Sequence, residues 1–261
     1  MSRYQRLTTL LELLAAAGHV SVDEAAEQLA VSPATVRRDL DSLAGQRLLT
    51  RTHGGAVSNG TSYELPLRYR SVRRAEQKVR IARCAAELVA PGSVVGLNGG
   101  TTSTEVARAL ATRADLLGGG DSARITVVTN ALNIASELTV RGHIKLVVLG
   151  GVPRPQSYEL IGPFSLPVLS QLRLDLAIIG VDALDVAHGA SSHNEAEAEI
   201  NARIAGQARR IALVADSSKL GRAAFAQIVR ADQVQLLITD TEAEPGLVTE
   251  LVGCGIEVIQ A

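Results

Sequence analysis

The chain lacks tryptophan, and aromatic residues make up only 2% of its 261 residues. Many proteins bind single-stranded nucleic acid by stacking its bases on aromatic side chains, so this composition argues against such a protein. Cysteine is almost as scarce. Cys84 and Cys254 have neither the number of a disulfide framework nor the spacing of metal ligands. We therefore expect no metal, no cofactor and no structural disulfide.

Long apolar runs are also missing. No stretch reaches the about 20 residues that cross a bilayer, and the first residues do not form a signal peptide. We expect a cytoplasmic protein with no membrane partner. The net charge of −1 argues against a protein that coats nucleic acid, whereas 46% hydrophobic residues fit a globular protein with a sizeable core. The length suits a domain of about 60 residues followed by a larger one.

Two short helices separated by a tight turn are predicted within residues 20–43. Ser21 and Glu24 form a capping-box pattern at the start of the first helix, and Ser32 followed by proline begins the second. A leucine repeat before this pair predicts a third helix that ends at Gly18. Three short helices in this order predict a DNA-binding helix-turn-helix domain.

The second helix of this pair turns its polar side chains outward, because Val36 and Leu40 recur at the spacing of a buried face. After it, residues 48–52 alternate and meet two glycines, which predicts a β-hairpin or wing. The alternative is a helical bundle with solvated arginines, but all four elements occur in the right order. The predicted DNA-contacting residues are Ser32, Thr35, Arg37, Arg38, Arg51 and His53.

The predicted head domain is not basic, since residues 1–60 contain six arginines and six acidic residues. DNA affinity must therefore come from charge on one face, or from several copies of the domain acting together. We expect a homo-oligomer, either a dimer or a tetramer. The segment after the wing is more basic and either contacts the DNA backbone or pairs with acids of the second domain. Its basic residues are Arg68, Arg70, Arg73, Arg74, Lys78, Arg80 and Arg83.

From about residue 75 onward, short runs of Val, Ile and Leu alternate with helical patterns, which predicts βα units around a mostly parallel sheet. The predicted strands are residues 94–97, 125–129, 144–149, 174–179, 211–215, 234–239 and 256–259. The predicted helices are residues 76–89, 104–111, 132–140, 195–209 and 246–252. We divide the chain into a winged helix-turn-helix domain (residues 1–57), a linker (58–74) and an α/β domain (75–261).

The segment after the first of these strands is rich in glycine and hydroxyl side chains. It consists of Asn98, Gly99, Gly100, Thr101, Thr102 and Ser103. Glycines allow a tight turn with exposed N–H groups, and a helix that begins near Thr104 directs the positive end of its dipole to the same place. This arrangement suits an anion, most naturally a phosphate. Neither a Walker motif nor a G-x-G-x-x-G fingerprint is present, and a plain strand-to-helix connection is the alternative.

Further polar residues follow other predicted strands, at the edge where open α/β sheets bind ligands. Those that could complete the anion site are Thr129, Asn130, Gly150, Gly151 and Lys219. Lys219 is notable because the chain has only three lysines, and a compact ammonium group could bind a phosphate or a sugar oxygen. The alternative is an exposed lysine that opens a loop. Those that could bind sugar hydroxyl or acetamido groups are Asp182, Asn194, Glu195 and Glu197. The alternative for the glutamates is the acidic first turn of a helix.

These segments together resemble bacterial DeoR-type transcriptional regulators over essentially the full length. The resemblance rests on motifs at residues 31–40, 51–56, 76–82, 100–102, 128–130, 150–151, 216–219 and 238–240. It implies a repressor of sugar catabolism genes that binds operator DNA, with a second domain similar to ribose-5-phosphate isomerase that senses a phosphorylated sugar. Residues 180–201 are similar to repressors of the N-acetylgalactosamine pathway, which suggests an amino-sugar or tagatose phosphate.

Two positions depart from the pattern of that family. Asn98 stands where many members carry Asp, and Asn201 stands where many carry Lys. Both changes alter the charge of the expected site, so the ligand cannot be taken from the family. The alternative function is a sugar-phosphate isomerase-like enzyme that carries a DNA-binding domain, with Asp182, Glu197 and Lys219 as base and electrophile. Similarity of fold does not establish chemistry, and we favour the repressor.

Overall fold

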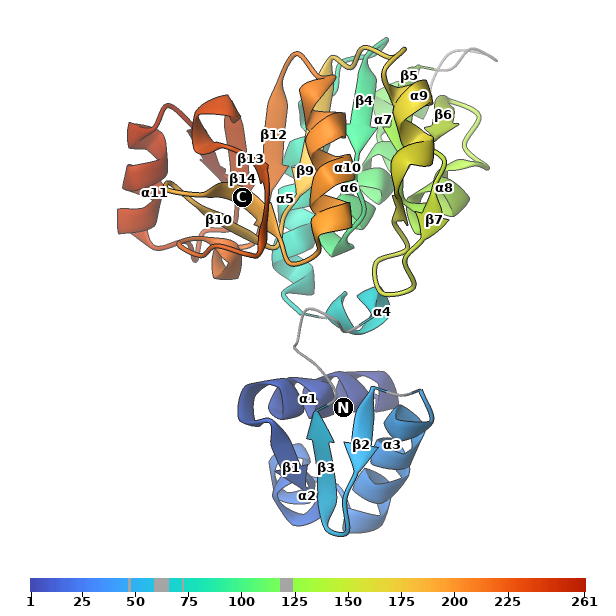
Figure 1. Cartoon of the computed structure of the whole chain (residues 1–261), viewed down its shortest axis with the longest axis vertical. Coiled ribbons are helices and arrows are strands. Elements are labelled where there is room, and N and C mark those ends of the chain that lie inside the picture. The colour runs from blue at the N-terminus through green and yellow to red at the C-terminus, as the bar shows by residue number, and fades with distance from the viewer. Residues whose placement is uncertain (47, 59–65, 72, 118–123) are drawn as a thin grey trace. The chain divides into compact units, whose positions relative to one another are not determined.

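The computed structural model describes residues 1–46, 48–58, 66–71, 73–117 and 124–261. These residues form two compact units, Met1–Arg73 and Arg74–Ala261, which are described separately (Figure 1). The segment expected as a linker is not a uniform connector. Its residues 59–65 and 72 lie outside the described part, whereas a short helix α4 (Leu67–Arg70) belongs to the first unit.

The first unit is a three-helix domain with a small antiparallel sheet. Its main elements are α1 (Arg3–Ala17), β1 (His19–Ser21), α2 (Val22–Leu29), α3 (Pro33–Gly45), β2 (Leu49–Arg51) and β3 (Gly55–Ser58). Ser21 and Ser32 cap α2 and α3 as predicted, and Gly18 ends α1 in a left-handed conformation. The strand order β1-β3-β2 adds one strand to the predicted wing. Tyr69 of α4 stacks on Tyr4 with ring centroids 5.7 Å apart.

The second unit is built around a parallel sheet of seven strands. In chain order they are β4 (Val94–Leu97), β5 (Ile125–Thr129), β6 (Ile144–Val148), β9 (Leu176–Gly180), β12 (Ile211–Val214), β14 (Leu236–Thr239) and β15 (Glu257–Gln260). Across the sheet they run β15-β14-β12-β9-β4-β5-β6, and every neighbouring pair is parallel. The order of connection reverses between β4 and β9. The C-terminal ends of these two strands therefore form the switch point at which such sheets bind ligands.

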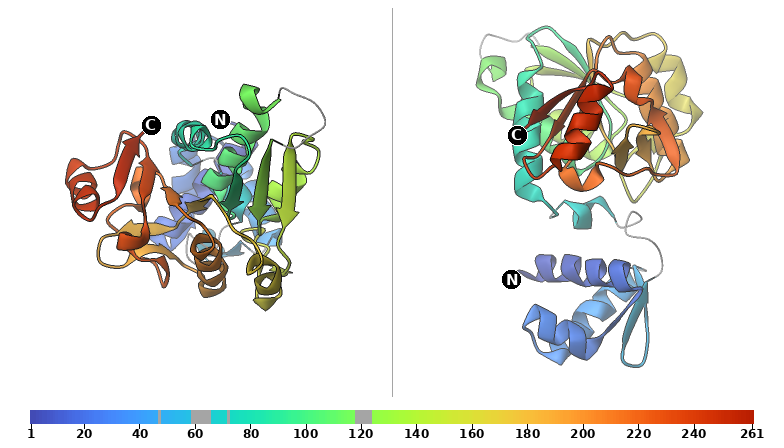
Figure 2. Two further views of the ribbon diagram at one scale, coloured as in Figure 1. Left: turned by 90° about the horizontal axis from the view of Figure 1, so that it is seen from above. Right: turned by 90° about the vertical axis from the view of Figure 1, so that its left-hand side faces the viewer.

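Helices cover both faces of the sheet. They are α5 (Ala75–Glu87), α6 (Thr101–Thr112), α7 (Ala114–Leu117), α8 (Leu132–Leu138), α9 (Leu166–Leu169), α10 (Glu195–Gly206) and α11 (Pro245–Gly253). Val95 and Leu97 pack towards α5, α6 and α8, whereas Ala177 and Ile179 pack towards α9 and α10. The left view of Figure 2 shows these two layers. The structure confirms the predicted winged helix-turn-helix and α/β architecture.

Several short elements were not predicted, because they contain few Val, Ile or Leu residues and so lack the apolar runs by which strands were predicted. They are β7 (Val152–Pro153), β8 (Leu160–Ile161), β10 (Ala183–Asp185), β11 (Gly189–Ser192), β13 (Ala226–Val229) and the 3-10 turns η2 (Pro163–Ser165), η3 (Ser217–Lys219) and η4 (Ala231–Gln233). Helix α6 begins three residues before the predicted start, since Thr104 N–H already bonds to Gly100 O. Helix α10 ends at Gly206 because Ala208 pairs with Leu174 in a β-bridge.

Candidate functional site

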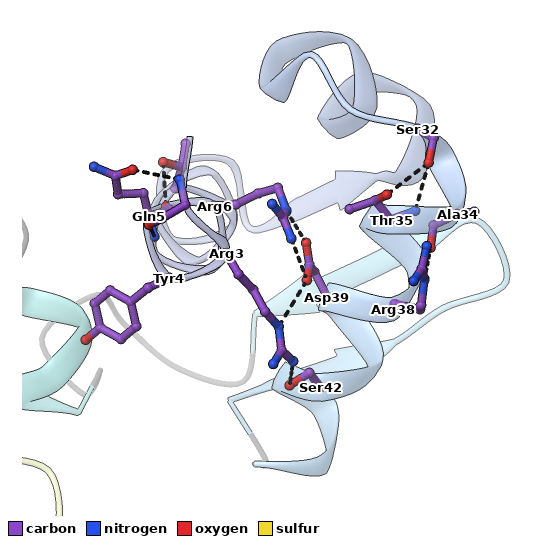
Figure 3. A network of polar contacts seen from close by, with 12 residues as sticks. Arg3, Tyr4, Gln5, Arg6, Ser32, Ala34, Thr35, Arg38, Asp39 and Ser42 are labelled. Carbon is purple, nitrogen blue, oxygen red and sulfur yellow. Dashed lines mark hydrogen bonds and ion pairs between the residues drawn. The ribbon is translucent and has the colours of Figure 1, made fainter.

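Helix α3 is held in the first unit by a buried carboxylate as well as by its apolar face. Asp39 is only 3% exposed and accepts hydrogen bonds from Arg6, one of them 3.3 Å long from Nη2 to Oδ1. Arg3 approaches the same carboxylate at 3.8 Å, as Figure 3 shows. On the opposite side of the helix, Arg37 and Arg38 are exposed. Two of the three predicted DNA-contacting arginines therefore stand on the exposed face of α3.

The start of α3 is fixed by hydroxyl side chains. Ser32 Oγ accepts the backbone N–H of Thr35 at 3.2 Å, and the two hydroxyl oxygens lie 2.9 Å apart (Figure 3). Arg38 Nε donates to the backbone oxygen of Ala34 at 3.3 Å, which directs its side chain along the helix. Ser32 therefore forms the cap of the helix, and its hydroxyl is already engaged there.

Arg51 and His53 lie on the wing but in different settings. Arg51 Nε donates to Asp41 Oδ1 at 2.8 Å, and its Nη1 donates to the backbone oxygen of Gly55. These contacts tie β2 to helix α3 and leave the side chain 28% exposed. His53 is exposed between β2 and β3. Arg51 therefore braces the wing, whereas His53 remains open to a partner.

In the second unit, Asn98 joins the ends of β4 and β9 at the switch point. Its Nδ2 donates to Gly180 O at 2.9 Å, and its Oδ1 accepts Gly180 N–H at 2.8 Å. Ser103 Oγ donates to the same Oδ1 at 2.9 Å. These contacts bring together two segments that are 82 residues apart in the chain. Asn98 therefore fixes the shape of the expected anion loop.

The backbone of this loop suits an anion. Gly100 caps α6 with φ 119° and ψ 163°, a conformation that residues with a side chain rarely adopt. Thr101, Thr102 and Ser103 then form the first helical turn, whose N–H groups have no acceptor within a helix. Thr101 is half-buried, whereas the next two residues are buried. The loop thus offers the start of a 12-residue helix to a ligand at the switch point.

Glu159, between β7 and β8, was not predicted as a site residue. Its carboxyl lies against Gly99, where an added Cβ would stand 2.6 Å from Oε1. Burial, followed by the charge of Glu197, raises the pKa of Glu159 to about 8. A single glutamate between two short strands gives no periodic signal, so only its contacts reveal it.

Asp182 and Glu197 meet at one hydroxyl group. Ser192 Oγ lies 3.0 Å from Asp182 Oδ2 and 3.5 Å from Glu197 Oε2. Arg154 Nη1 pairs with Glu197 Oε1 at 3.1 Å. Both carboxylates also act on the buried Glu159. The structure therefore gathers these two predicted residues beside the anion loop.

Asn194 and Glu195 take positions at the start of α10. Asn194 caps this helix by accepting the N–H of Glu197 at 3.1 Å, and Glu195 is exposed. Acidic side chains in a first turn favour the helix through its dipole. The alternative interpretation of these glutamates therefore accounts for the position of Glu195, whereas Glu197 also belongs to the acidic group.

The predicted site residues at the ends of β5 and β6 make structural contacts within the fold. Thr129 Oγ1 accepts the N–H of Ala131 at 3.1 Å, and Asn130 is fully buried beside β8. Gly150 and Gly151 follow β6. An added Cβ on Gly151 would stand 2.7 Å from Ile161 O, so this glycine lets β8 approach.

Lys219 does not lie next to the anion loop in the sheet order. It follows β12, and β9 separates that strand from β4. The next residue, Leu220, instead forms a bridge with Leu184, two residues beyond Asp182. The preceding turn is held by Arg74, whose Nη1 donates to Ser217 Oγ at 2.9 Å and to Glu242 Oε2 at 3.0 Å. Arg74, from the basic segment, therefore pairs with acids of its own unit.

Other features of the described residues lie apart from this site. A groove of about 360 Å³ between α5 and α6 is lined by residues such as Arg83 and Arg108, none of them predicted as site residues. Within the described ranges, no three His, Cys, Asp or Glu side chains converge to hold a metal ion. No helix in the part of the chain that was placed is long and apolar enough to cross a membrane.

Comparison with known proteins gives matches to both units. The DeoR-like helix-turn-helix domain matches residues 6–62, and the DeoR C terminal sensor domain matches residues 73–241. The glycerol-3-phosphate regulon repressor of Escherichia coli K12 is 35% identical over 92% of both chains. The transcriptional regulator GlpR of Haloferax volcanii is 33% identical over 98% of this chain and 96% of its own.

Among solved structures, the ribose 5-phosphate isomerase A of Methanocaldococcus jannaschii matches with 18% identity and a TM-score of 0.39. The match covers 56% of this chain and 54% of that chain. A similarity this distant says nothing about the chemistry of the site.

Proposed function

Because this chain belongs to the DeoR family of DNA-binding transcriptional regulators, we propose that it represses genes of sugar or amino-sugar catabolism under the control of a phosphorylated sugar. The first unit binds operator DNA and the second binds the effector. A ligand that prefers one arrangement of the regulator shifts its affinity for DNA. The protein acts in the cytoplasm, beside the DNA.

The exposed face of α3 is the observation that supports the DNA-binding part of this proposal. Arg37 and Arg38 are exposed there, while Asp39 on the other side anchors the helix to Arg6. Guanidinium groups on such a helix read guanine in the major groove or bind phosphates. Thr35, His53 and the wing add further contacts. Since the head has balanced charge, we propose that dimers or tetramers supply linked heads to a repeated operator.

The switch point supports the effector part. The loop from Asn98 to Ser103 presents the start of α6, which suits the phosphate. Asp182 and Glu197 lie nearby and can accept hydrogen bonds from sugar hydroxyl groups. We propose that this site binds the sugar phosphate without converting it, since the two curated relatives described above are named as regulators.

Selection of DNA sites from a random library with the full-length protein tests the proposal that the protein is an operator-binding repressor. We expect an enriched site with repeated halves, from which a phosphorylated sugar, but not its unphosphorylated parent, changes the affinity. If no sugar phosphate changes the affinity for the enriched DNA site, the proposed control by a phosphorylated sugar is wrong. Incubation of the protein with ribose 5-phosphate and amino-sugar phosphates tests the enzyme alternative, because useful turnover would contradict a regulator that only binds.

A further inference from the structure

Three buried oxygen atoms around Glu159 lack a hydrogen-bond donor within the part of the chain that the structure describes. They are Glu159 Oε2, Asn130 Oδ1 and Asn201 Oδ1, on residues that are 2%, 0% and 3% exposed. The residues are neighbours. Glu159 forms a β-bridge with Ala131, next to Asn130, and the Asn201 side chain lies close enough to the Glu159 carboxyl to influence its pKa. Buried acceptors without donors are rare, so this group points to a missing donor.

The surroundings of these oxygens are also acidic. The charged groups that act most strongly on Glu159 are the carboxylates of Glu197 and Asp182. Arg154 lies near them, but its guanidinium is paired with Glu197 at 3.1 Å. With a pKa of about 8, Glu159 holds its proton at pH 7, and a positive charge placed beside it would lower that pKa and let the carboxyl ionise as a hydrogen-bond acceptor. Asn201, which lies beside Glu159, contributes no such charge.

We propose that these oxygens receive a primary ammonium group of the effector, so that the sensed ligand is an amino-sugar phosphate with a free amine. The inference rests on the function proposed above, since it adds a second group to the same ligand. An ammonium group has three N–H donors and no acceptor, which matches three acceptors without donors. A hydroxyl group offers one donor, and an acetamido group one N–H and a carbonyl oxygen, and neither carries positive charge.

The phosphate and the ammonium group would bind on the two sides of Gly99. Gly99 lies at their boundary, because it belongs to the anion loop and also contacts Glu159. Asp182 and Glu197 are half-buried, so the acidic side is reached from solvent. A ligand with both charges would therefore satisfy the start of α6 and the acidic group at once.

Matched hexose 6-phosphates that differ only at C2 test the inference. Glucosamine, glucose and N-acetylglucosamine 6-phosphates, and their galactose counterparts, are titrated by calorimetry into the full-length protein at pH 7. In at least one sugar configuration we expect the amine to bind about tenfold more tightly than its hydroxyl counterpart, because its hydrogen bonds are charge-assisted. Equal or tighter binding of the hydroxyl sugar in both configurations overturns the inference but leaves sugar-phosphate sensing intact. If none of the six binds, both fail.

Two variants locate the ammonium group. Glu159→Gln keeps the shape but cannot ionise beside a bound ammonium group, so the preference for the amine should fall about tenfold while binding of the hydroxyl sugar is retained. Asn201→Lys supplies the chain's own ammonium group and should abolish the preference. Glu199→Gln, an exposed carboxylate on the same helix as Glu197, is the control and should bind like wild type. An unchanged preference in both test variants, with normal operator binding as evidence of folding, overturns the assignment.

Discussion

Asn98 and Gly180 form two hydrogen bonds with each other, in the manner of two paired backbone segments. The side-chain amide of Asn98 both donates to Gly180 O, at 2.9 Å, and accepts from Gly180 N–H, at 2.8 Å. Only an amide of this length can fill both roles, since a carboxylate accepts but does not donate. Asn98 therefore links the ends of β4 and β9 at the switch point through hydrogen bonds rather than through a charge.

Asn98→Asp should accordingly destabilise the second unit. The carboxylate cannot donate to Gly180 O and is left facing it, so we expect the free energy of unfolding to fall by about 1–3 kcal/mol. The loss should be larger at pH 8 than at pH 5, because a protonated aspartate can still donate. Urea unfolding of wild type and variant at both pH values measures this. Wild-type stability of the variant at pH 8 would show that the Nδ2 hydrogen bond contributes little.

Glu159 predicts a specific dependence of stability on pH. Burial raises its pKa from 4.5 to about 8, so the folded protein holds this proton more tightly than the unfolded chain does. The stability from this proton is fully present below pH 4.5 and is lost as the pH rises to about 8. Glu159→Gln cannot ionise, so its melting temperature should fall less than that of wild type over this range. An equal fall in melting temperature for the two proteins over this pH range would contradict the raised pKa of Glu159.

The parts of this molecule that could be predicted are those with local signals. Each of these signals lies within a few residues of the chain. Examples are the caps at Ser21 and Ser32 and the buried spacing of Val36 and Leu40, and the structure has the predicted helices. Glu159 could not be predicted, because its environment comes from Gly99 and other residues far away in the chain.

Strand order limits prediction in a similar way. The sequence places Lys219 and the Asn98 loop after strands, but it does not say which strands are neighbours. The sheet places β9 between β12 and β4, so the two segments are not adjacent. The start of α6 was also predicted too late, because the unusual conformation of Gly100 lets the helix begin at Thr101.

Arg37→Ala and Arg38→Ala should weaken binding to the selected operator. We expect a loss of about 1–3 kcal/mol where the side chain bonds to guanine, and less where it contacts only phosphate. Both residues are exposed, so the melting temperature should not change. Arg209→Ala, at an exposed arginine of the second unit, is the matched control. Fluorescence anisotropy with labelled operator measures the affinities, and full affinity in both variants would place the DNA-reading surface elsewhere.

A pair of variants can distinguish the contribution of the anion loop (residues 98–103) to effector binding from that of Lys219. Gly100→Ala forces a side chain onto φ 119°, so the loop must shift and its N–H groups lose their alignment with a phosphate. We expect binding of the sugar phosphate to fall by more than about tenfold, a loss comparable to one or two charge-assisted hydrogen bonds. Lys219→Ala should cost less, because β9 lies between its strand and the loop.

Calorimetric titration of the sugar phosphate and its unphosphorylated parent into wild type and both variants compares these effects. Operator binding without effector should survive in both variants, which shows that the proteins are folded and that only sensing has been lost. If Lys219→Ala loses as much affinity as Gly100→Ala, the lysine reaches the phosphate despite the strand between them. If Gly100→Ala binds the sugar phosphate normally, the loop from Asn98 to Ser103 does not hold the phosphate. The resulting regulator would then need another anion site, since the start of α6 is the feature that supports this one.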